Sequence, residues 1–400
     1  MDRLRVRVYN VRFGDALLVS VPDRAANGST EMRHILIDVG NVLGGEGGED
    51  VLFRPVIEDI LRTLDGRRLD LYVMTHEHMD HVQGLLYAEE KLFPDKSLRD
   101  MLRTRHAWLT ASAEPGYYAK EGHEQARKAF EETRETYAAI ARFLAAAPEQ
   151  ETPWLRALML NNDPRNTADC VDYLRGLAGK TWYVYRGLDL AGKHPFQEAR
   201  FEIWAPEEDT SVYYGKFQPM ALGVAQGGRK PTLTLPVPPP GVDAGTFYNL
   251  VDMRRWGFAD NLLAIDRAAN NTSLVFCLEW RGWRLLFPGD AELRSWKTMH
   301  KYGQLKPVHF LKVSHHGSHN GTPPRSLIDI MLPAASAEAQ TAVVSAYRGT
   351  YKDVPHDATL VELGGRCSLH SVLGMPDGYY LDVEFTENED GRPGRVTVRA

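Results

Sequence analysis

Apolar and polar positions alternate near the N-terminus, and short apolar runs recur through the second half of the chain. Leu4, Val6 and Val8 alternate with charged residues, which predicts a half-buried strand, and residues 16–21 predict a second strand paired with it as a hairpin. Residues 34–39 predict a third strand, and the apolar run 71–74 predicts a short buried one. Further strands are expected at 181–186, 200–205, on either side of Trp280-Arg-Gly-Trp283, and at 308–313, 342–346, 367–373 and 379–385.

Between about residues 88 and 180 the pattern changes to charged, helix-prone sequence without strand alternation. Within it Phe130, Tyr137, Ile140 and Leu144 recur at helical spacing and fall on one face of a long helix. We therefore expect one domain over residues 1–400 with a helical insertion at about 88–180. Its basic residues either meet an anionic substrate or form a solvated helix face; they are Arg99, Arg103, Arg105, Lys120, Arg127 and Lys128.

Residues 215–247 are rich in glycine and proline and predict a long loop. Long loops beside functional sites often act as lids, although this stretch could equally be an inert excursion.

Composition narrows the class of protein. Hydrophobic residues make up 43% of the chain and charged residues 25%, which is ordinary for a soluble globular protein. The net charge of -6 gives no overall basic footprint, so any nucleic-acid binding would depend on a local patch. The three cysteines lack paired spacing, the N-terminus lacks a secretory signal, and no apolar stretch is long enough to span a membrane. We expect a cytoplasmic protein without a membrane partner.

Four metal-ligand side chains follow the buried strand 71–74 directly: His76, His78, Asp80 and His81. His76 and His78 are two residues apart and can point the same way from an extended backbone, while Asp80 and His81 follow as the chain turns. This spacing suits two adjacent metal ions. Isolated surface histidines are the usual alternative, but burying this cluster unpaired would cost roughly several kcal/mol. A structural zinc site is a second alternative, but such sites favour closed, cysteine-rich ligand sets.

Two other predicted strands end in ligand-type residues. Asp290 ends the strand after Trp283, and His315 and His316 follow the strand 308–313. Asp38 ends the strand 34–39, where it either orients a metal ligand or caps a turn. Oxygen and imidazole ligands without cysteine suit Zn²⁺, with Mn²⁺ or iron as alternatives.

These motifs resemble those of the metallo-β-lactamase superfamily. Residues 75–81, Thr-His-Glu-His-Met-Asp-His, match its His-x-His-x-Asp-His signature. The resemblance is strongest to the hydrolase domain of the competence protein ComEC and its stand-alone soluble relatives. It rests on segments 11–19, 36–40, 270–275, 287–290 and 311–318, and it skips the helical insertion.

The resemblance implies an α+β fold, a four-layer αββα sandwich, and specific metal ligands. One ion would lie on His76, His78 and bridging Asp290, and the other on Asp80, His81, Asp290 and His315. The usual further histidine of the first site is replaced by Asn270 or Asn271, which leaves that site with fewer strong ligands. Asp38, Asn270, Asn271 and His316 are therefore supporting or alternative ligands.

His356, in Val-Pro-His-Asp, resembles a late position of these relatives. It is a candidate for holding substrate or protonating the leaving group, and a helix cap or surface residue is the alternative.

The function implied is hydrolysis by a metal-bound hydroxide that Asp80 helps to position. The resemblance points to a phosphodiester, with single-stranded DNA as one candidate. Lactone, thioester or small phosphoester hydrolysis is the alternative among enzymes. A metal-stabilised binding protein, whose helical insertion engages a partner of unknown identity, is the alternative outside them.

Overall fold

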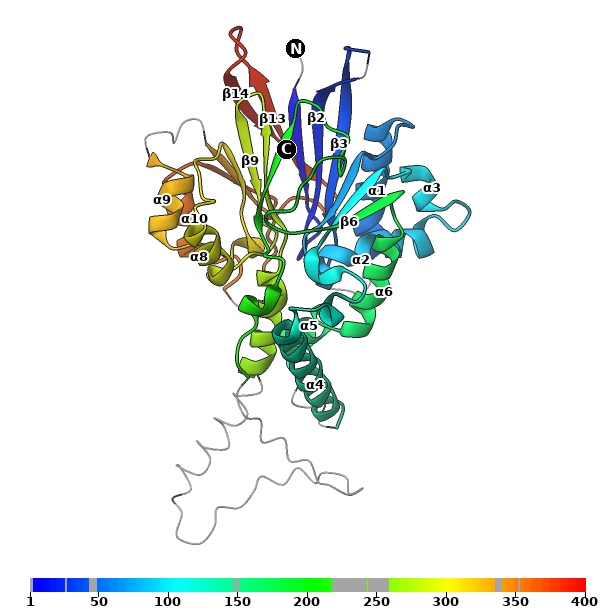
Figure 1. The fold of residues 1–400 in the computed structure, drawn as a ribbon, viewed down its shortest axis with the longest axis vertical. Coiled ribbons are helices and arrows are strands. Elements are labelled where there is room, and N and C mark those ends of the chain that lie inside the picture. The colour runs from blue at the N-terminus through cyan, green and yellow to red at the C-terminus, as the bar shows by residue number, and fades with distance from the viewer. Residues whose placement is uncertain are drawn as a thin grey trace.

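The computed structural model describes residues 3–25, 27–42, 49–146, 148, 151–217, 243, 259–334, 340–351 and 353–400. Within them the chain forms two β-sheets with helices beside each (Figure 1). The mixed α+β class expected from the sequence is present. Among the described residues, no helix is both long and apolar enough to cross a bilayer.

In the described part of the chain the first sheet has eight strands, and it changes from antiparallel to parallel pairing along its width. Its order is β14 (Pro393–Arg399), β13 (Tyr380–Glu387), β1 (Leu4–Tyr9), β2 (Ala16–Arg24), β3 (Thr30–Val39), β4 (Leu71–Met74), β5 (His106–Thr110) and β6 (Lys180–Val184). Strands β3 to β6 are parallel, so their carboxyl ends share one edge of the sheet. The predicted hairpin of β1 and β2 is present as an antiparallel pair.

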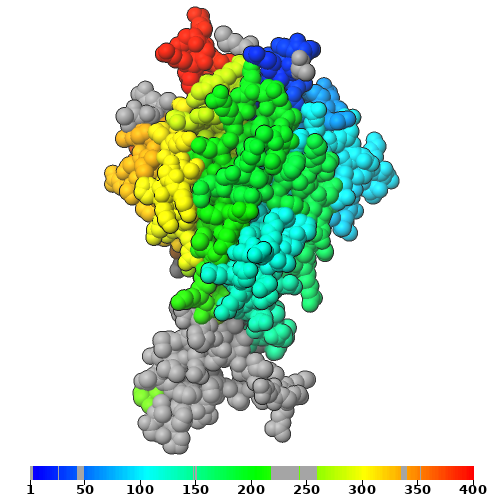
Figure 2. All heavy atoms as spheres, viewed as in Figure 1, coloured from blue at the N-terminus to red at the C-terminus, as the bar shows by residue number. Residues whose placement is uncertain are grey.

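The second sheet has six strands among the described residues. Its order is β12 (Ser368–Ser371), β11 (Thr341–Val344), β10 (Phe310–Lys312), β9 (Trp283–Phe287), β8 (Val275–Trp280) and β7 (Arg200–Ala205). Strands β9 and β10 are parallel, so the segments that follow them leave the sheet side by side. In Figure 2 the green residues, which include β6 and β7, lie across this face between the yellow and the cyan parts of the chain.

The helices are α1 (Glu49–Leu64), α2 (Met79–Tyr87), α3 (Leu98–Leu102), α4 (Glu124–Ala146), α5 (Pro153–Asn161), α6 (Pro164–Arg175), α8 (Leu293–Lys301), α9 (Arg325–Met331) and α10 (Asp357–Gly364), with helical residues also at 259–271. Three buried clusters show how they pack. One joins the first sheet to α1, α2 and α6. Another joins the second sheet to α8, α9 and α10. The third contains side chains from both sheets, so the sheets pack against each other.

Two expectations from the sequence need correction, and a third falls mostly on residues that the structure does not describe. The block expected to be purely helical contains β5, which pairs with β4 and β6. This strand is almost wholly buried within a parallel sheet, so it lacks the alternation that marks a half-exposed strand. The expected last strand is followed by another, β14. Most of the Gly/Pro-rich stretch 215–247 lies outside the described residues.

Candidate metal centre

Three strand ends deliver the predicted ligand residues to one place. Strand β4 runs into residues 75–78, and Asp80 and His81 lie in the first turn of α2. Asp290 follows β9, and His315 and His316 follow the parallel neighbour β10. Residues from both sheets therefore meet where the carboxyl ends of their strands approach one another.

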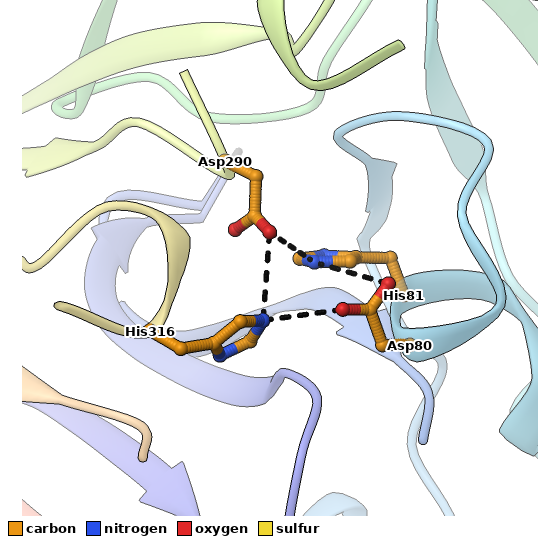
Figure 3. Close-up of side chains that lie close together, drawn as sticks. All are labelled: Asp80, His81, Asp290 and His316. Carbon is orange, nitrogen blue, oxygen red and sulfur yellow. Dashed lines mark hydrogen bonds and ion pairs between the residues drawn. The ribbon is translucent and has the colours of Figure 1, made fainter. Parts of the chain in front are cut away.

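Asp80, His81, Asp290 and His316 form one group of four potential ligands (Figure 3). His316 Nε2 lies 3.2 Å from Asp80 Oδ2 and 3.4 Å from Asp290 Oδ2. His81 Nε2 lies 3.3 Å from Asp290 Oδ2. All four side chains are at most 1% exposed. We call these four residues the central cluster.

Ligand atoms of the central cluster lack hydrogen-bond partners although they are buried. They are both carboxylate oxygens of Asp290, Asp80 Oδ1 and His81 Nε2. A buried polar atom without a partner costs about 1–3 kcal/mol, and more if it is charged. A cation coordinated by these atoms would satisfy them all, and oxygen with imidazole is a donor set that zinc and manganese accept. The residues present therefore fit a metal ion.

Charge in the central cluster is balanced between carboxylates and imidazoles. Burial alone would lower the pKa of His316, but the carboxylates of Asp290 and Asp80 outweigh it and raise the pKa to about 10. Burial would likewise raise the pKa of Asp290, but His81 and His316 hold it well below its usual value. A metal ion would take the place of these imidazolium protons, since ligands bind it deprotonated.

Hydrogen bonds behind the rings point Nε2 of both histidines into the cluster. Asp38 Oδ2 lies 2.8 Å from His81 Nδ1. Asp38 is itself fixed by Thr75, whose backbone N–H and hydroxyl donate to its two oxygens at 2.8 and 2.7 Å. His316 Nδ1 lies 3.2 Å from the carbonyl oxygen of Ser345. Such contacts set the tautomer and orientation of metal-binding histidines.

His76, His78 and Asp80 form a second group of potential ligands. His76 Nε2 lies 3.1 Å from His78 Nδ1, and His78 Nε2 lies 2.9 Å from Asn162 Oδ1. Burial lowers the pKa of His76 well below its usual value, which favours the neutral ring that binds metals. Asp80 belongs to both groups, so the two positions adjoin.

The structure places His315 differently from the expectation. His316, not His315, lies beside Asp80 and Asp290. His315 points to Glu292, with Nδ1 3.2 Å from Glu292 Oε1. His315 and His316 both have left-handed backbones, which turn the two successive rings in different directions.

A third group, missed in the sequence, surrounds His315: it contains Asp266 and Glu292. Asn270 Nδ2 donates to Asp266 Oδ2 and to Glu292 Oε1, each at 3.1 Å. Asn162 donates to the other oxygen of Asp266 at 2.9 Å, which joins this group to the second one. Two features of the sequence could have indicated this group. Asp266 lies four residues before Asn270 on a helix, and Glu292 lies two residues after Asp290.

The remaining two candidates lie outside all three groups. Asn271 accepts hydrogen bonds from the backbone N–H and hydroxyl of Ser295 at 2.9 and 3.0 Å, so it fixes the start of α8. His356 precedes α10, where its ring contacts Thr359 Oγ1 at 3.1 Å and packs beside His319. His356 occupies the position before α10, but its side chain makes no capping hydrogen bond there.

The fold and site define a mixed α+β protein with a buried histidine–carboxylate centre at the ends of its strands. No protein-family model matches the chain, and no curated protein matches it significantly.

Proposed function

We propose that this protein is a metal-dependent hydrolase of the metallo-β-lactamase type, with the four-layer αββα sandwich of that superfamily and a relation to the ComEC-type hydrolase domain. The observation that carries the proposal is the central cluster, in which buried ligand atoms of Asp80, His81 and Asp290 converge beside His316 without hydrogen-bond partners. The packing of two sheets against each other, with helices beside each, supports the sandwich.

In this proposal Asp80, His81, Asp290 and His316 hold one Zn²⁺ or Mn²⁺ ion, and His76 and His78 offer a neighbouring position. A bound divalent cation would supply Lewis acidity and activate water at neutral pH. The chain's own residues orient the reaction. Asp38 and the Ser345 carbonyl fix the two imidazoles, and Asp80, shared by both groups, would position the nucleophile.

Phosphodiesters are the proposed substrates. Two adjoining cation positions suit an anionic phosphorus centre, because each can offset charge on an attacking or leaving oxygen. The sequence resemblance points the same way.

The test combines metal analysis with a substrate panel. Purified protein should contain about one or two zinc or manganese ions per chain, and Asp290→Asn should lose metal and activity while staying folded. Asp169→Asn, which alters an exposed carboxylate on α6, should keep both. Folded wild-type protein that takes up no metal after supplementation would overturn the proposal.

The panel contains single-stranded DNA, a small chromogenic phosphodiester, a lactone and a thioester, each with Zn²⁺ or Mn²⁺. Turnover of the lactone or thioester alone, lost in Asp290→Asn, would keep the metal centre and replace the substrate class.

A further inference from the structure

A cavity of about 690 Å³ lies between helices α4 and α6 and the helical residues around 265–272. Its walls come from the segment 112–119, from α4 and α6, and from Ile265 to Thr272. This volume is within the range of pockets that enclose small organic ligands. We call it the aromatic cavity.

The aromatic cavity reaches the metal-ligand groups through two of its lining residues. His78 lines it and belongs to the second group of potential ligands. Asn162 also lines it and lies 2.9 Å from His78 Nε2. A molecule in the cavity would therefore be in contact with side chains of the candidate centre.

Aromatic rings dominate one wall. Tyr118 and Phe130 are stacked with their centroids 3.9 Å apart and their planes at 9°. Tyr214 joins them through a hydroxyl–hydroxyl contact of 2.8 Å with Tyr118, and Tyr137 extends the wall along α4. Such a surface favours another planar ring, which can stack on it or meet its edges.

Charge in the cavity does not favour a run of phosphates. Its positively charged lining residues are Arg127, Arg134 and Arg175. Its negatively charged lining residues are Glu77, Glu114, Glu131 and Asp172. The Arg175 guanidinium donates to the carbonyl of Ala113, and that of Arg134 lies 5.7 Å from the Phe130 ring centre. With no excess of cations, the cavity suits an uncharged ring better than a polyanionic strand.

Three of the six basic residues considered either for an anionic substrate or for a solvated helix face contact other parts of the chain. Arg99 lies over the Tyr173 ring, Arg103 donates to the Gly66 carbonyl, and Arg105 pairs with Asp70. Of the six residues considered from the sequence, Arg127 alone lines the aromatic cavity as the structure describes it.

We propose that the aromatic cavity binds a single nucleobase of the substrate, while the ester linkage lies at the metal centre. The inference rests on the proposed hydrolase function. It makes Phe130 and Tyr118 specificity-determining residues, and it favours a small diester with one ring over a long strand.

The experiment compares two diesters with the same leaving group, methyl 4-nitrophenyl phosphate and the 4-nitrophenyl ester of thymidine 5′-monophosphate. The wild-type protein should prefer the thymidine ester by about tenfold or more in kcat/KM, the scale of one stacked base. Phe130→Ala should remove most of this preference, mainly by raising the KM of the thymidine ester. Phe143→Ala, a half-buried ring on the same helix outside the cavity lining, should keep the preference.

Binding gives a second readout that does not need turnover. Thymidine 5′-monophosphate should bind more tightly than inorganic phosphate in calorimetric titrations, and Phe130→Ala, but not Phe143→Ala, should abolish the difference. Equal preference in wild-type protein and Phe130→Ala would overturn the inference even if both hydrolyse the esters. If no ester is cleaved but the binding difference follows Phe130, the hydrolase proposal fails and the binding site stands.

Discussion

A buried ion pair behind the central cluster gives a quantitative test of the structure. Lys312 Nζ lies 2.7 Å from Asp15 Oδ2, and the two side chains are 2% and 1% exposed. The pair joins residues 297 positions apart, one before β2 and one at the end of β10, so it ties the two sheets together. Lys312 is the only hydrogen-bond partner found for the Asp15 carboxylate among the described residues.

Replacing Lys312 by Met should therefore destabilise the fold strongly. At 2.7 Å the direct attraction is about 6 kcal/mol for an effective dielectric constant of roughly 20. Part of this is offset by the cost of burying both charges. Removing one partner of such a pair typically costs about 3–5 kcal/mol. His316 Nδ1 lies 3.9 Å from Asp15 Oδ1 and is a second positive group beside this carboxylate, so the lower end of that range applies. We expect that loss in the free energy of unfolding.

Urea denaturation in the presence of a chelator isolates this effect from metal binding. The chain offers a matched control in Lys306 and Glu202, whose contact is also 2.7 Å but whose side chains are 39% and 44% exposed. Lys306→Met should cost about 1 kcal/mol or less. The double variant Asp15→Asn with Lys312→Met should lose far less than the sum of the single variants, because the two groups interact directly. Equal, small losses for Lys312→Met and Lys306→Met would refute the reasoning.

Two further predictions concern buried polar groups near the first sheet. Burial, helped by the positive charges of Arg67 and Arg7, lowers the pKa of His34 to about 4 from its ordinary 6.5. The unfolded chain therefore binds the extra proton between those values, and acidification from pH 8 to pH 5 should cost about 2 kcal/mol of stability through this group. His34→Gln should be less sensitive to pH by that amount in urea titrations, and equal sensitivity would contradict the assignment. Asp38→Asn would place an amide against His81 Nδ1, so zinc affinity should fall about 10- to 100-fold in a chelator competition; unchanged affinity would show that Asp38 does not orient the ring.

Most of the strands and the ligand segment 76–81 could be predicted from the sequence. Alternating apolar and polar residues mark a strand locally, and closely spaced ligand residues mark a metal site locally. It could not distinguish His315 from His316. The two are adjacent, and a turn with left-handed backbones at both residues decides which ring faces Asp80. The strand β5 escaped notice because burial within a parallel sheet removes the alternation on which strand prediction depends.

Asp266 and Glu292 were not predicted for a different reason. Each lies on a separate element, and only tertiary packing brings them beside His315. The signature residues 76–81 are close together in sequence, whereas this group becomes visible only when the helical residues 259–271 and the segment after β9 are placed in space. Local spacing thus revealed the ligands of one segment but not the neighbours that surround them.

The same packing explains why two positions in the N-terminal motifs, Gly14 and Gly40, are glycine. A Cβ atom on Gly40 would lie 2.2 Å from the backbone nitrogen of His81, and one on Gly14 would lie 2.7 Å from the carbonyl oxygen of Asp80. The backbone N–H of Asp15 donates to that same oxygen at 3.0 Å. The loops before β2 and after β3 therefore contact the backbone of Asp80 and His81 directly. Glycine is required there because no side chain fits between these loops and the residues that would hold the metal.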